Sequence, residues 1–573
     1  MFRLQDQKTF KNISFFHSFF RYYVIFYSCM KSKKTKSQIL TRAQERMLAR
    51  SKDLNYLIIQ DKHGKAVFRK SIYSRIILNF FLIAVQIAIF TVFLLEFQSK
   101  LELYFGVSLI LSTSFIIYLS NCGGKNEYKI AWLLPTIIFP LFGVSAYILY
   151  HTNLGGRKIR KKLAVLKDKT KSCLPSKEAS LELLKKYPEM QGLGTYLINS
   201  GSYYPHTNTN VTYFKSGEEF YPDMFQFVVA AKKFIFIEFF IIEVDETWAL
   251  LVELLEQKVK EGLEVRVMMD GLGSPVASQK VYQKYLRSKG IKVHTFLPLV
   301  PFFSTQQNNR DHRKIVIIDG EVAYTGGVNL SNQYMNRGSN KFAYWKDNAV
   351  RVEGPAIQNF MLMFLQTWNV DQKEKDDFVR LINFPYPKKD AGGLVIPYGD
   401  DAFNREDIAE NIYLHIIANA KKYLYITSPY MVIDNQLQSA LIFAAKRGVD
   451  VRIIVPSQPD HFLTFCIGKT YLKTLQENGI KIYTYQKGFI HSKTFICDDI
   501  ISTVGSVNLD YRSLFYHFEC GILMYDMSAI LDARDDFVET LKDCQMMDND
   551  SYKKIPSYQR AIGRVFRVFA SLI

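Results

Sequence analysis

The strongest constraint on the fold is an internal repeat in the second part of the chain. Residues 230–242 (AAKKFIFIEFFII) resemble 419–431 (NAKKYLYITSPYM), and both predict a basic helix end followed by a short buried strand. Two further pairs follow in the same order, EGLEVRVMMD with RGVDVRIIVP and LRSKGIKVHTF with LQENGIKIYTY. The offsets between partners are 189, 186 and 189 residues, so order and spacing are both kept. The sequence therefore predicts two related structural units.

The repeat also indicates the fold class. Within each copy, short apolar runs alternate with helical patterns such as residues 247–260. This alternation is typical of βαβ units with largely parallel strands, so we expect an α/β protein. One lobe is expected at 205–385 and a related lobe at 394–573, separated by a polar stretch with proline and glycine. Two copies in one chain usually pack around a pseudo-two-fold axis, which brings equivalent residues together.

A second repeated motif follows these segments in each copy, and it contains the residues expected to carry out the chemistry. HRKIVIIDGEVAYTGGVN runs from His312 to Asn329, and HSKTFICDDIISTVGSVN runs from His491 to Asn508. In both copies lysine follows histidine by two residues, aspartate follows lysine by five, and asparagine follows histidine by 17. Because several spacings coincide, a chance pair of His-x-Lys segments is a poor explanation.

The spacing of histidine and lysine places them on one face of a strand. Side chains in a strand alternate with a period of two, so His312 and Lys314 point the same way, as do His491 and Lys493. Two imidazoles and two ammonium groups then form a positive pocket that suits a tetrahedral phosphodiester. One histidine can attack phosphorus while the other protonates the leaving oxygen, so we expect no metal and no cofactor.

The remaining motif positions support this pocket. Asp319 and Asp498 belong to the repeated catalytic motif, but each lies an odd number of residues beyond its lysine, which indicates a mainly structural role at the strand end. The glycines that follow allow a turn with close backbone approach. Asn329 and Asn508 then present amide groups, which we expect to bind the substrate phosphate.

The signature HxKxxxxD followed by G-G/S-x-N resembles the duplicated motif of the phospholipase D superfamily, over roughly 205–573. Longer stretches resemble bacterial cardiolipin synthases, including NNRDHRKIVIIDG, YWKDNAVRVEGPAI, ITSPYMVID and GSVNLDYRSLFYHFE, and so does the N-terminal apolar block with its basic flank. The resemblance implies two phospholipase D-like lobes. It also implies condensation of two phosphatidylglycerol molecules into cardiolipin and glycerol, through a phosphatidyl-histidine intermediate.

The resemblance also implies roles for single residues. His312 is expected to be the nucleophile and His491 the acid and then the base, while the reverse assignment stays open. Glu519 matches the acidic position after the second motif, and Asp347 follows YWK where the family often has WRD. We expect these two carboxylates to orient the histidines; the alternative is an ordinary buried ion pair. The sequence departs from the family at His517, where asparagine is common.

Composition limits the classes of binding partner and of fold that the chain can have. The chain has 73 Lys and Arg against 54 Asp and Glu, a net charge of +19, which favours nucleic acid, phosphate esters or an anionic membrane face. With 573 residues, 48% of them hydrophobic, the chain can bury large cores, which excludes general disorder. The seven cysteines are scattered without a CxxC pair, which argues against a disulfide framework and a zinc site.

The N-terminal part of the sequence predicts membrane insertion. After a basic region at 1–75, apolar runs at 76–95, 103–120 and 130–150 approach the length needed for a ~30 Å hydrocarbon core. A basic juxtamembrane linker is expected at 151–204. Positive charge flanks the runs on both sides, which favours an even number of crossings, whereas the sequence has three runs, so one run is expected to re-enter or to lie in the interface. We expect two or three crossings in a multi-pass protein of the cell membrane, with the catalytic region on the cytoplasmic side.

Other functions could use the same pocket. A phospholipase D hydrolase would replace the second lipid by water, and another phosphatidyltransferase would accept serine or ethanolamine. A membrane-tethered nuclease or nucleic-acid-binding protein fits the charge, but the apolar runs weigh against it, and we expect no nucleic acid partner. A purely structural membrane protein is the last alternative. The expected partners are phosphatidylglycerol and an anionic membrane surface; the sequence does not predict the oligomeric state.

Overall fold

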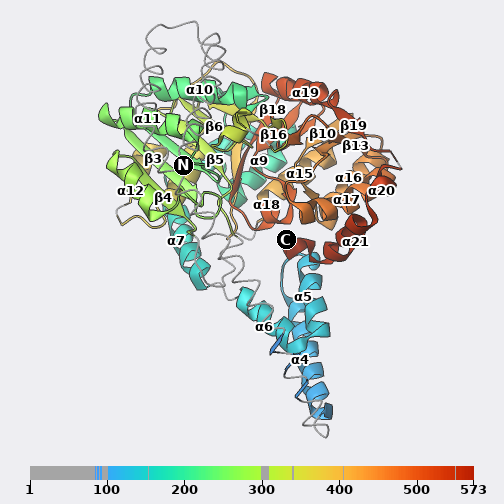
Figure 1. Ribbon diagram of the computed structural model, residues 1–573. Helices are drawn as coiled ribbons and strands as arrows, with labels where there is room; N and C mark the ends of the chain where they lie inside the picture. The colour runs from blue at the N-terminus through green and yellow to red at the C-terminus, as the bar shows by residue number, and fades with distance from the viewer. Residues whose placement is uncertain are drawn as a thin grey trace, which may run out of the picture.

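The computed structural model has two α/β lobes side by side and a helical arm that projects from them (Figure 1). It describes residues 101–151, 154–298, 309–338, 341–373, 375–403, 406–548 and 550–572, with six helical positions before residue 93. The basic region expected at 1–75 lies outside the described residues, and so does the apolar run 76–95 apart from those six positions.

The first lobe is built on a seven-stranded sheet. Its strands are β1 (Asn210–Phe214), β2 (Phe234–Phe239), β3 (Glu264–Asp270), β4 (Lys292–Phe296), β5 (Lys314–Ile318), β6 (Val322–Gly326) and β8 (Ala349–Glu353). They lie in the order β1-β8-β6-β5-β2-β3-β4. The helices of this lobe are α10 (Gly217–Ala230), α11 (Glu246–Lys260), α12 (Lys280–Ser288) and η3 (Asn332–Met335).

The second lobe repeats this arrangement. Its strands are β9 (Leu394–Asp400), β10 (Tyr423–Thr427), β12 (Asp450–Pro456), β13 (Lys481–Tyr485), β15 (Thr494–Cys497), β16 (Ile501–Gly505), β18 (Glu519–Tyr525) and β19 (Cys544–Met546). Read from β9, the order β9-β18-β16-β15-β10-β12-β13-β19 matches the first lobe strand for strand, with β19 added at the edge. The predicted α/β class and its two related lobes are confirmed.

The strands are less parallel than the sequence indicates. Only β2-β3-β4 and β10-β12-β13 run parallel, and the other neighbours in both sheets are antiparallel. The reason lies in the motifs themselves. A short turn joins β5 to β6 and β15 to β16, and a turn of that length allows only an antiparallel hairpin.

The two sheets share one core. In β5, Ile315 and Ile317 join a cluster that also contains residues of the second sheet, such as Ile496, whereas Val316 and Ile318 face the core under α10 and α11. The helices that complete the lobes are α13 (Ile357–Trp368), α14 (Phe378–Ile382), α15 (Ile408–Asn419), α16 (Asn435–Lys446), α17 (Phe462–Glu477), α18 (Tyr511–Phe515) and α19 (Ser528–Leu541). Because side chains of both sheets pack in this one cluster, packing fixes the position of one lobe relative to the other.

The arm consists of α4 (Leu101–Asn121), α5 (Asn126–Ile138) and α6 (Pro140–His151). α4 contains the run expected at 103–120, and the run at 130–150 is divided at Phe139 into α5 and α6, of 13 and 12 residues. Each is shorter than the ~20 residues that cross a bilayer as a helix. Among the described residues, no helix combines the length and hydropathy of a membrane span. Membrane-spanning helices, expected from the sequence, are therefore not established by the described part of the chain.

Residues 154–201, within the segment expected as a linker, form α7 (Leu154–Lys171), α8 (Lys177–Leu184) and α9 (Pro188–Gly201). Leu166, Leu184 and Leu197 from these helices are buried in the core shared by the two sheets. The described chain ends with α20 (Ser551–Lys554), α21 (Ser557–Phe566) and η4 (Arg567–Leu572), and η4 packs against α5 of the arm (Figure 1).

Candidate active site

The two motif histidines are each held by the opposite lobe. The backbone N–H of His312 donates a hydrogen bond to the carbonyl of Phe518 (2.8 Å), and that of His491 donates to the carbonyl of Lys346 (2.7 Å). The second contact continues a short parallel pairing between β7 (Trp345–Lys346) and β14 (Phe489–Ile490). This reciprocal exchange places both motifs at the lobe interface, as the duplicated sequence predicts.

The side chains follow the same reciprocal pattern. Nδ1 of His312 lies 2.9 Å from both carboxylate oxygens of Glu519, which belongs to β18 of the second lobe. Nδ1 of His491 lies 2.7 Å from Oδ2 of Asp347, which belongs to the first lobe. Both carboxylates are fully buried. The structure thus brings Asp347 and Glu519 to the histidines, with each carboxylate serving the histidine of the other lobe.

Glu519 is surrounded by further donors. The hydroxyl of Ser513 donates to it at 2.6 Å, and the hydroxyl of Ser506 donates to its other oxygen. Burial opposes the charge of Glu519, but His312 and His517 hold its pKa below the usual range. In the same way, burial opposes the charge of Asp347, while His491 and Lys493 hold its pKa low. Both carboxylates therefore carry negative charge at neutral pH.

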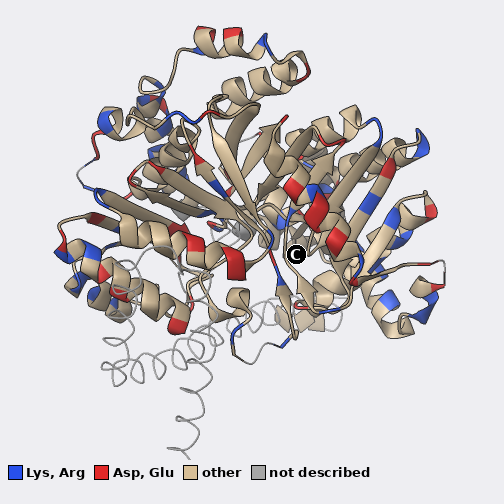
Figure 2. Cartoon of the chain, turned by 90° about the horizontal axis from the view of Figure 1, so that it is seen from above, with Lys and Arg blue, Asp and Glu red and all other residues tan. Residues whose placement is uncertain are grey.

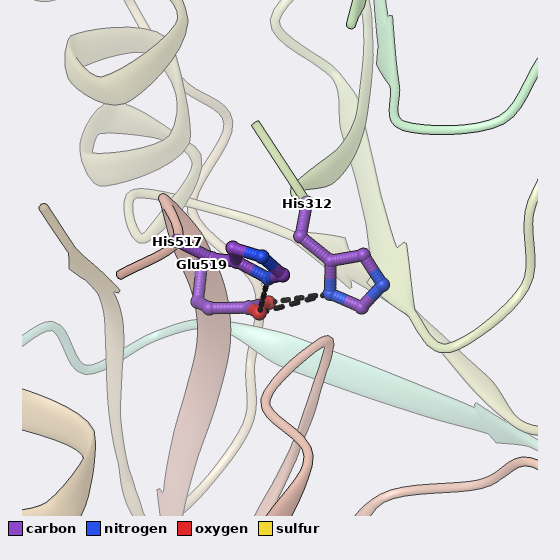
Figure 3. Close-up of side chains that lie close together, drawn as sticks. All are labelled: His312, His517 and Glu519. Carbon is purple, nitrogen blue, oxygen red and sulfur yellow. Dashed lines mark hydrogen bonds and ion pairs between the residues drawn. The ribbon is translucent and has the colours of Figure 1, made fainter. Parts of the chain in front are cut away.

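The imidazoles are kept neutral in the unliganded site. Burial lowers the pKa of His312 to about 3 and that of His491 to about 4, against the opposing attraction of Glu519 and Asp347. With Nδ1–H directed at a carboxylate, Nε2 keeps its lone pair, and in His312 that nitrogen points away from Glu519 (Figure 3). An anionic phosphate in the pocket raises the pKa of both rings, which a general acid requires.

The two lysines supply positive charge close to the histidines. Nζ of Lys314 donates to the carbonyl of His312 at 2.5 Å, and Nζ of Lys493 donates to the carbonyl of His491 and lies 2.9 Å from its Nδ1. Burial lowers the pKa of Lys314 to about 8 and that of Lys493 to about 7. The charge of Lys314 contributes to the low pKa values of both His491 and Lys493, so the two motifs share one electrostatic environment.

The two asparagines of the motifs differ in their hydrogen bonds. Asn329 donates from Nδ2 to the hydroxyl of Tyr334 (2.6 Å) and accepts from the N–H of Ile241 (3.2 Å). Asn508 is also buried, and its Oδ1 has no hydrogen-bond partner among the described residues. The amide of Asn508 is therefore the more available of the two for a substrate oxygen.

Asp319 and Asp498 lie away from the histidines, at the far ends of β5 and β15. Asp319 accepts three backbone N–H bonds from residues 232–234 at 2.6–2.8 Å, and Asp498 accepts three from residues 421–423 at 2.6–2.9 Å. Both have a positive φ, 56° and 55°, in the left-handed region that aspartate tolerates better than most residues. Each carboxylate fixes the start of the neighbouring strand, which agrees with a structural role.

His517 is the residue whose importance the sequence does not reveal. Its ring centroid lies 5.7 Å from that of His312, and its Nδ1 lies 3.5 Å from Glu519 (Figure 3). The strand register makes Trp345 its counterpart, since Gly326 pairs with Ala349 as Gly505 pairs with Gly521. Trp345 accordingly lies 5.2 Å from His491. The pocket is thus asymmetric, with a third imidazole beside His312 and an indole beside His491.

Two of the imidazoles and one carboxylate form the one group among the described residues whose spacing could hold a metal ion. Ligand atoms of His312, His517 and Glu519 all lie within 4.8 Å of one another. However, Glu519 already accepts hydrogen bonds from Ser506, Ser513 and His312, and Lys314 places a positive charge nearby. This donor set fits a hydrogen-bond network that orients an imidazole better than it fits a cation.

A glycine makes room for one of the orienting carboxylates. A Cβ on Gly327 would lie 2.0 Å from Oδ1 of Asp347, whereas Ser506 occupies the equivalent position of the second motif. We expect Gly327→Ala to displace Asp347 from His491 and to lower kcat about 10- to 100-fold, because small misplacements of catalytic groups are costly. Steady-state kinetics on folded protein measures this.

Ser506→Ala is the matched control for Gly327→Ala. It removes one donor to Glu519 without adding bulk, so its effect on kcat should stay below about tenfold. A Gly327→Ala protein with unchanged kcat would show that Asp347 can move without affecting the reaction.

The two lobes and the paired motifs define a phospholipase D-like enzyme. A family profile described as "Cardiolipin synthase, PLD-like domain" matches residues 224–368 and 413–541. The cardiolipin synthases of Alkalihalophilus pseudofirmus and Geobacillus kaustophilus are each 31% identical to the chain, over 82% and 83% of it and 94% and 95% of their own length. The chain belongs to the cardiolipin synthase family, which confirms the resemblance found in the sequence.

The chain also resembles an uncharacterised bacterial protein in sequence and a solved enzyme structure in fold. An uncharacterized protein of Streptococcus mutans is 39% identical over 80% of this chain and 99% of its own length. Among solved structures, a phosphatidylserine synthase from Haemophilus influenzae aligns with a TM-score of 0.50 and 16% identity, covering 63% of this chain and 95% of its own. At that identity the likeness concerns the fold alone.

Proposed function

We propose that the protein transfers a phosphatidyl group between two phosphatidylglycerol molecules and so forms cardiolipin and glycerol. The observation that carries the proposal is the pair of imidazoles at one interface, each oriented by a carboxylate of the opposite lobe and flanked by a buried lysine. Membership of the cardiolipin synthase family supports the same reaction.

In the first half-reaction, Nε2 of His312 attacks the phosphorus of one phosphatidylglycerol. His491 takes up a proton at Nε2 when the anionic phosphate binds. The bond from phosphorus to the headgroup oxygen then breaks, His491 donates this proton to that oxygen, and glycerol leaves. Lys314 and Lys493, together with Asn508 and Asn329, are proposed to stabilise the phosphoryl oxygens. Glu519 stabilises the positive charge that develops on the phosphorylated imidazole ring.

In the second half-reaction, the glycerol hydroxyl of another phosphatidylglycerol gives its proton to His491. Its oxygen attacks phosphorus, the bond to His312 breaks, and cardiolipin is released. Both histidines return to their starting protonation states, so the cycle needs no nucleotide. One phosphodiester replaces another, and the reaction consumes nothing but the two lipids.

We also propose that the N-terminal part anchors the enzyme in the cell membrane with its lobes on the cytoplasmic side. Support comes from the exposed apolar side chains of α4, where Leu109 and Ile110 are 69% and 68% exposed, and from the apolar run 76–95 in the sequence. The basic α7, with Arg157 and Arg160, would face the anionic membrane surface.

The distribution of charge weighs against a nuclease. Residues 1–100 contain 18 of the 73 Lys and Arg but only 5 of the 54 Asp and Glu, so most of the surplus positive charge lies before the lobes. Over the lobes themselves, residues of both signs are interspersed (Figure 2). A nucleic-acid-binding face would instead gather Lys and Arg along one groove or stripe.

The proposed function is tested by product analysis. Purified full-length protein in vesicles is given phosphatidylglycerol labelled in its glycerol headgroup and in one acyl chain. We expect cardiolipin and free glycerol in equal amounts, because transfer releases one glycerol for each cardiolipin formed. Phosphatidic acid as the main product would identify a hydrolase, and phosphatidylserine formed when serine is added would identify another phosphatidyltransferase.

A further inference from the structure

A large cavity lies between the arm and the second lobe, outside the pocket of the two histidines. Its volume is about 1490 Å³, and its walls come from α4, α5, α6, α18 and the C-terminal η4. Pockets for small ligands typically measure about 300–1,000 Å³, so this cavity has room for a larger molecule. Ten of its 27 lining residues are Phe, Tyr or Trp, among them Trp132, Phe142, Phe403, Phe515, Phe566 and Phe569.

Ion pairs of one lysine hold the arm against the second lobe beside this cavity. Nζ of Lys125, in the loop between α4 and α5, lies 2.5 Å from Glu410 and 3.0 Å from Asp434 of the second lobe. The N–H of Asn435 donates to Glu127 of α5 at 3.2 Å. The cavity is therefore a structural feature of the docked arm.

Cations lie where the cavity meets α7. Arg160 lines the cavity, and Arg157, Arg160 and His151 line an adjoining hollow of about 200 Å³ that shares Phe403 with it. Among the described residues, neither Arg157 nor Arg160 forms an ion pair. A cavity rich in aromatic side chains, with exposed guanidinium groups at its edge, fits an amphipathic anion.

The cavity adjoins the His312 side of the catalytic pocket. Phe403 in its wall packs edge-on against Phe518, with ring centroids 5.3 Å apart. Phe518 in turn accepts the backbone hydrogen bond of His312 and directly precedes Glu519. Two more lining residues are close in sequence to these groups: Tyr516 lies two residues before Phe518, and Asn309 lies three residues before His312. A ligand in the cavity is thus one side chain away from the strand that orients His312.

From these observations we infer that the cavity binds the acyl chains of the phospholipid whose phosphate is attacked by His312. The inference rests on the proposed function and adds a substrate site to it. The exposed apolar face of the arm leads from the expected bilayer to the cavity, so acyl chains can enter without crossing water. The arginines at the edge attract the anionic lipid as it enters from the membrane, and its phosphate then moves to the pocket of Lys314 and Lys493.

Cavity-filling variants test the inference. Ala402 and Ala146 line the cavity, so Ala402→Trp and Ala146→Trp each place an indole in the proposed acyl site. With dioleoyl-phosphatidylglycerol we expect KM to rise at least about tenfold, because several methylene groups lose their apolar contacts. With dihexanoyl-phosphatidylglycerol, whose chains are short, kcat/KM should stay within about twofold of the wild type. Val281→Trp, on the exposed surface of α12, is the control and should change neither value.

A second measurement does not depend on the bulk of the variants. Trp132 lines the cavity, and the chain has four tryptophans in all. Phosphatidylglycerol with brominated acyl chains should quench part of the tryptophan emission, and Trp132→Phe should abolish that part. Brominated phosphatidylcholine at the same mole fraction should quench Trp132 much less, because the arginines attract a lipid with net negative charge and not a zwitterionic one.

The outcomes separate the inference from the proposed function. If wild-type protein makes no cardiolipin from either lipid, the proposed function is wrong. If it does, and both tryptophan variants change the two lipids equally or not at all, the acyl site lies elsewhere. Equal quenching by the two brominated lipids would also overturn the inference, since it would reflect bulk bilayer contact.

Discussion

His312→Ala should abolish formation of a phospho-enzyme, whereas His491→Ala should allow it to form and then prevent its breakdown. With phosphatidylglycerol, we expect His312→Ala to lower kcat by at least about 10⁴-fold, as for loss of a nucleophile. His491→Ala should lower it about 10²- to 10⁴-fold, as for loss of a general acid and base. Both variants are thus nearly inactive in steady state, and the difference between them must be measured within one turnover.

A substrate with a good leaving group separates the two histidines. Phosphatidyl-p-nitrophenol releases a stable phenolate that needs no proton, so the general acid is not required for the first step. We expect His491→Ala to release one nitrophenolate for each enzyme molecule in a burst and to retain acid-labile phosphate on His312. His312→Ala should give no burst.

The opposite pattern would identify His491 as the nucleophile, the alternative that the sequence leaves open. A burst from both variants would contradict the two-histidine mechanism altogether. Because His312 and His491 are buried, circular dichroism and thermal unfolding should accompany each assay, so that a missing burst can be attributed to chemistry.

Part of the pocket could be predicted because the spacing within each motif is local. The period of two grouped His312 with Lys314, although His312 lies just before β5 and both His491 and Lys493 lie just before β15, so each motif lies at the start of its strand rather than within it. The odd spacing of Asp319 likewise indicated that its carboxylate leaves the pocket, and its three backbone partners at residues 232–234 agree with this. Such inferences require no knowledge of how the lobes meet.

The cross-lobe partnerships could not be predicted in this way. Glu519 follows the second motif in sequence but orients His312 of the first, because β18 faces the first lobe across the shared core. The position of His517 opposite Trp345 depends on the register of β18 with β16 and of β8 with β6. The local sequence pattern predicts neither the strand register nor the packing of the lobes, because both depend on burial between residues far apart in the sequence.

The cross-lobe arrangement makes a specific prediction for the orienting carboxylates. Glu519→Gln should lower kcat about 10²- to 10⁴-fold, since an amide neither fixes the Nδ1–H tautomer of His312 reliably nor balances the charge on the phosphorylated ring. With phosphatidyl-p-nitrophenol, this variant should slow the burst itself. Asp347→Asn acts on His491 and should leave the burst rate nearly unchanged while slowing turnover.

Asp319→Asn is the control within the same motif. Asparagine tolerates the positive φ of this position but weakens the bonds to the backbone at residues 232–234, so we expect a lower Tm and a normal kcat for the folded fraction. If Asp347→Asn slowed the burst and Glu519→Gln did not, each carboxylate would serve the histidine of its own lobe in the reaction. That result would contradict a catalytic role for the reciprocal contacts of His312 with Glu519 and of His491 with Asp347.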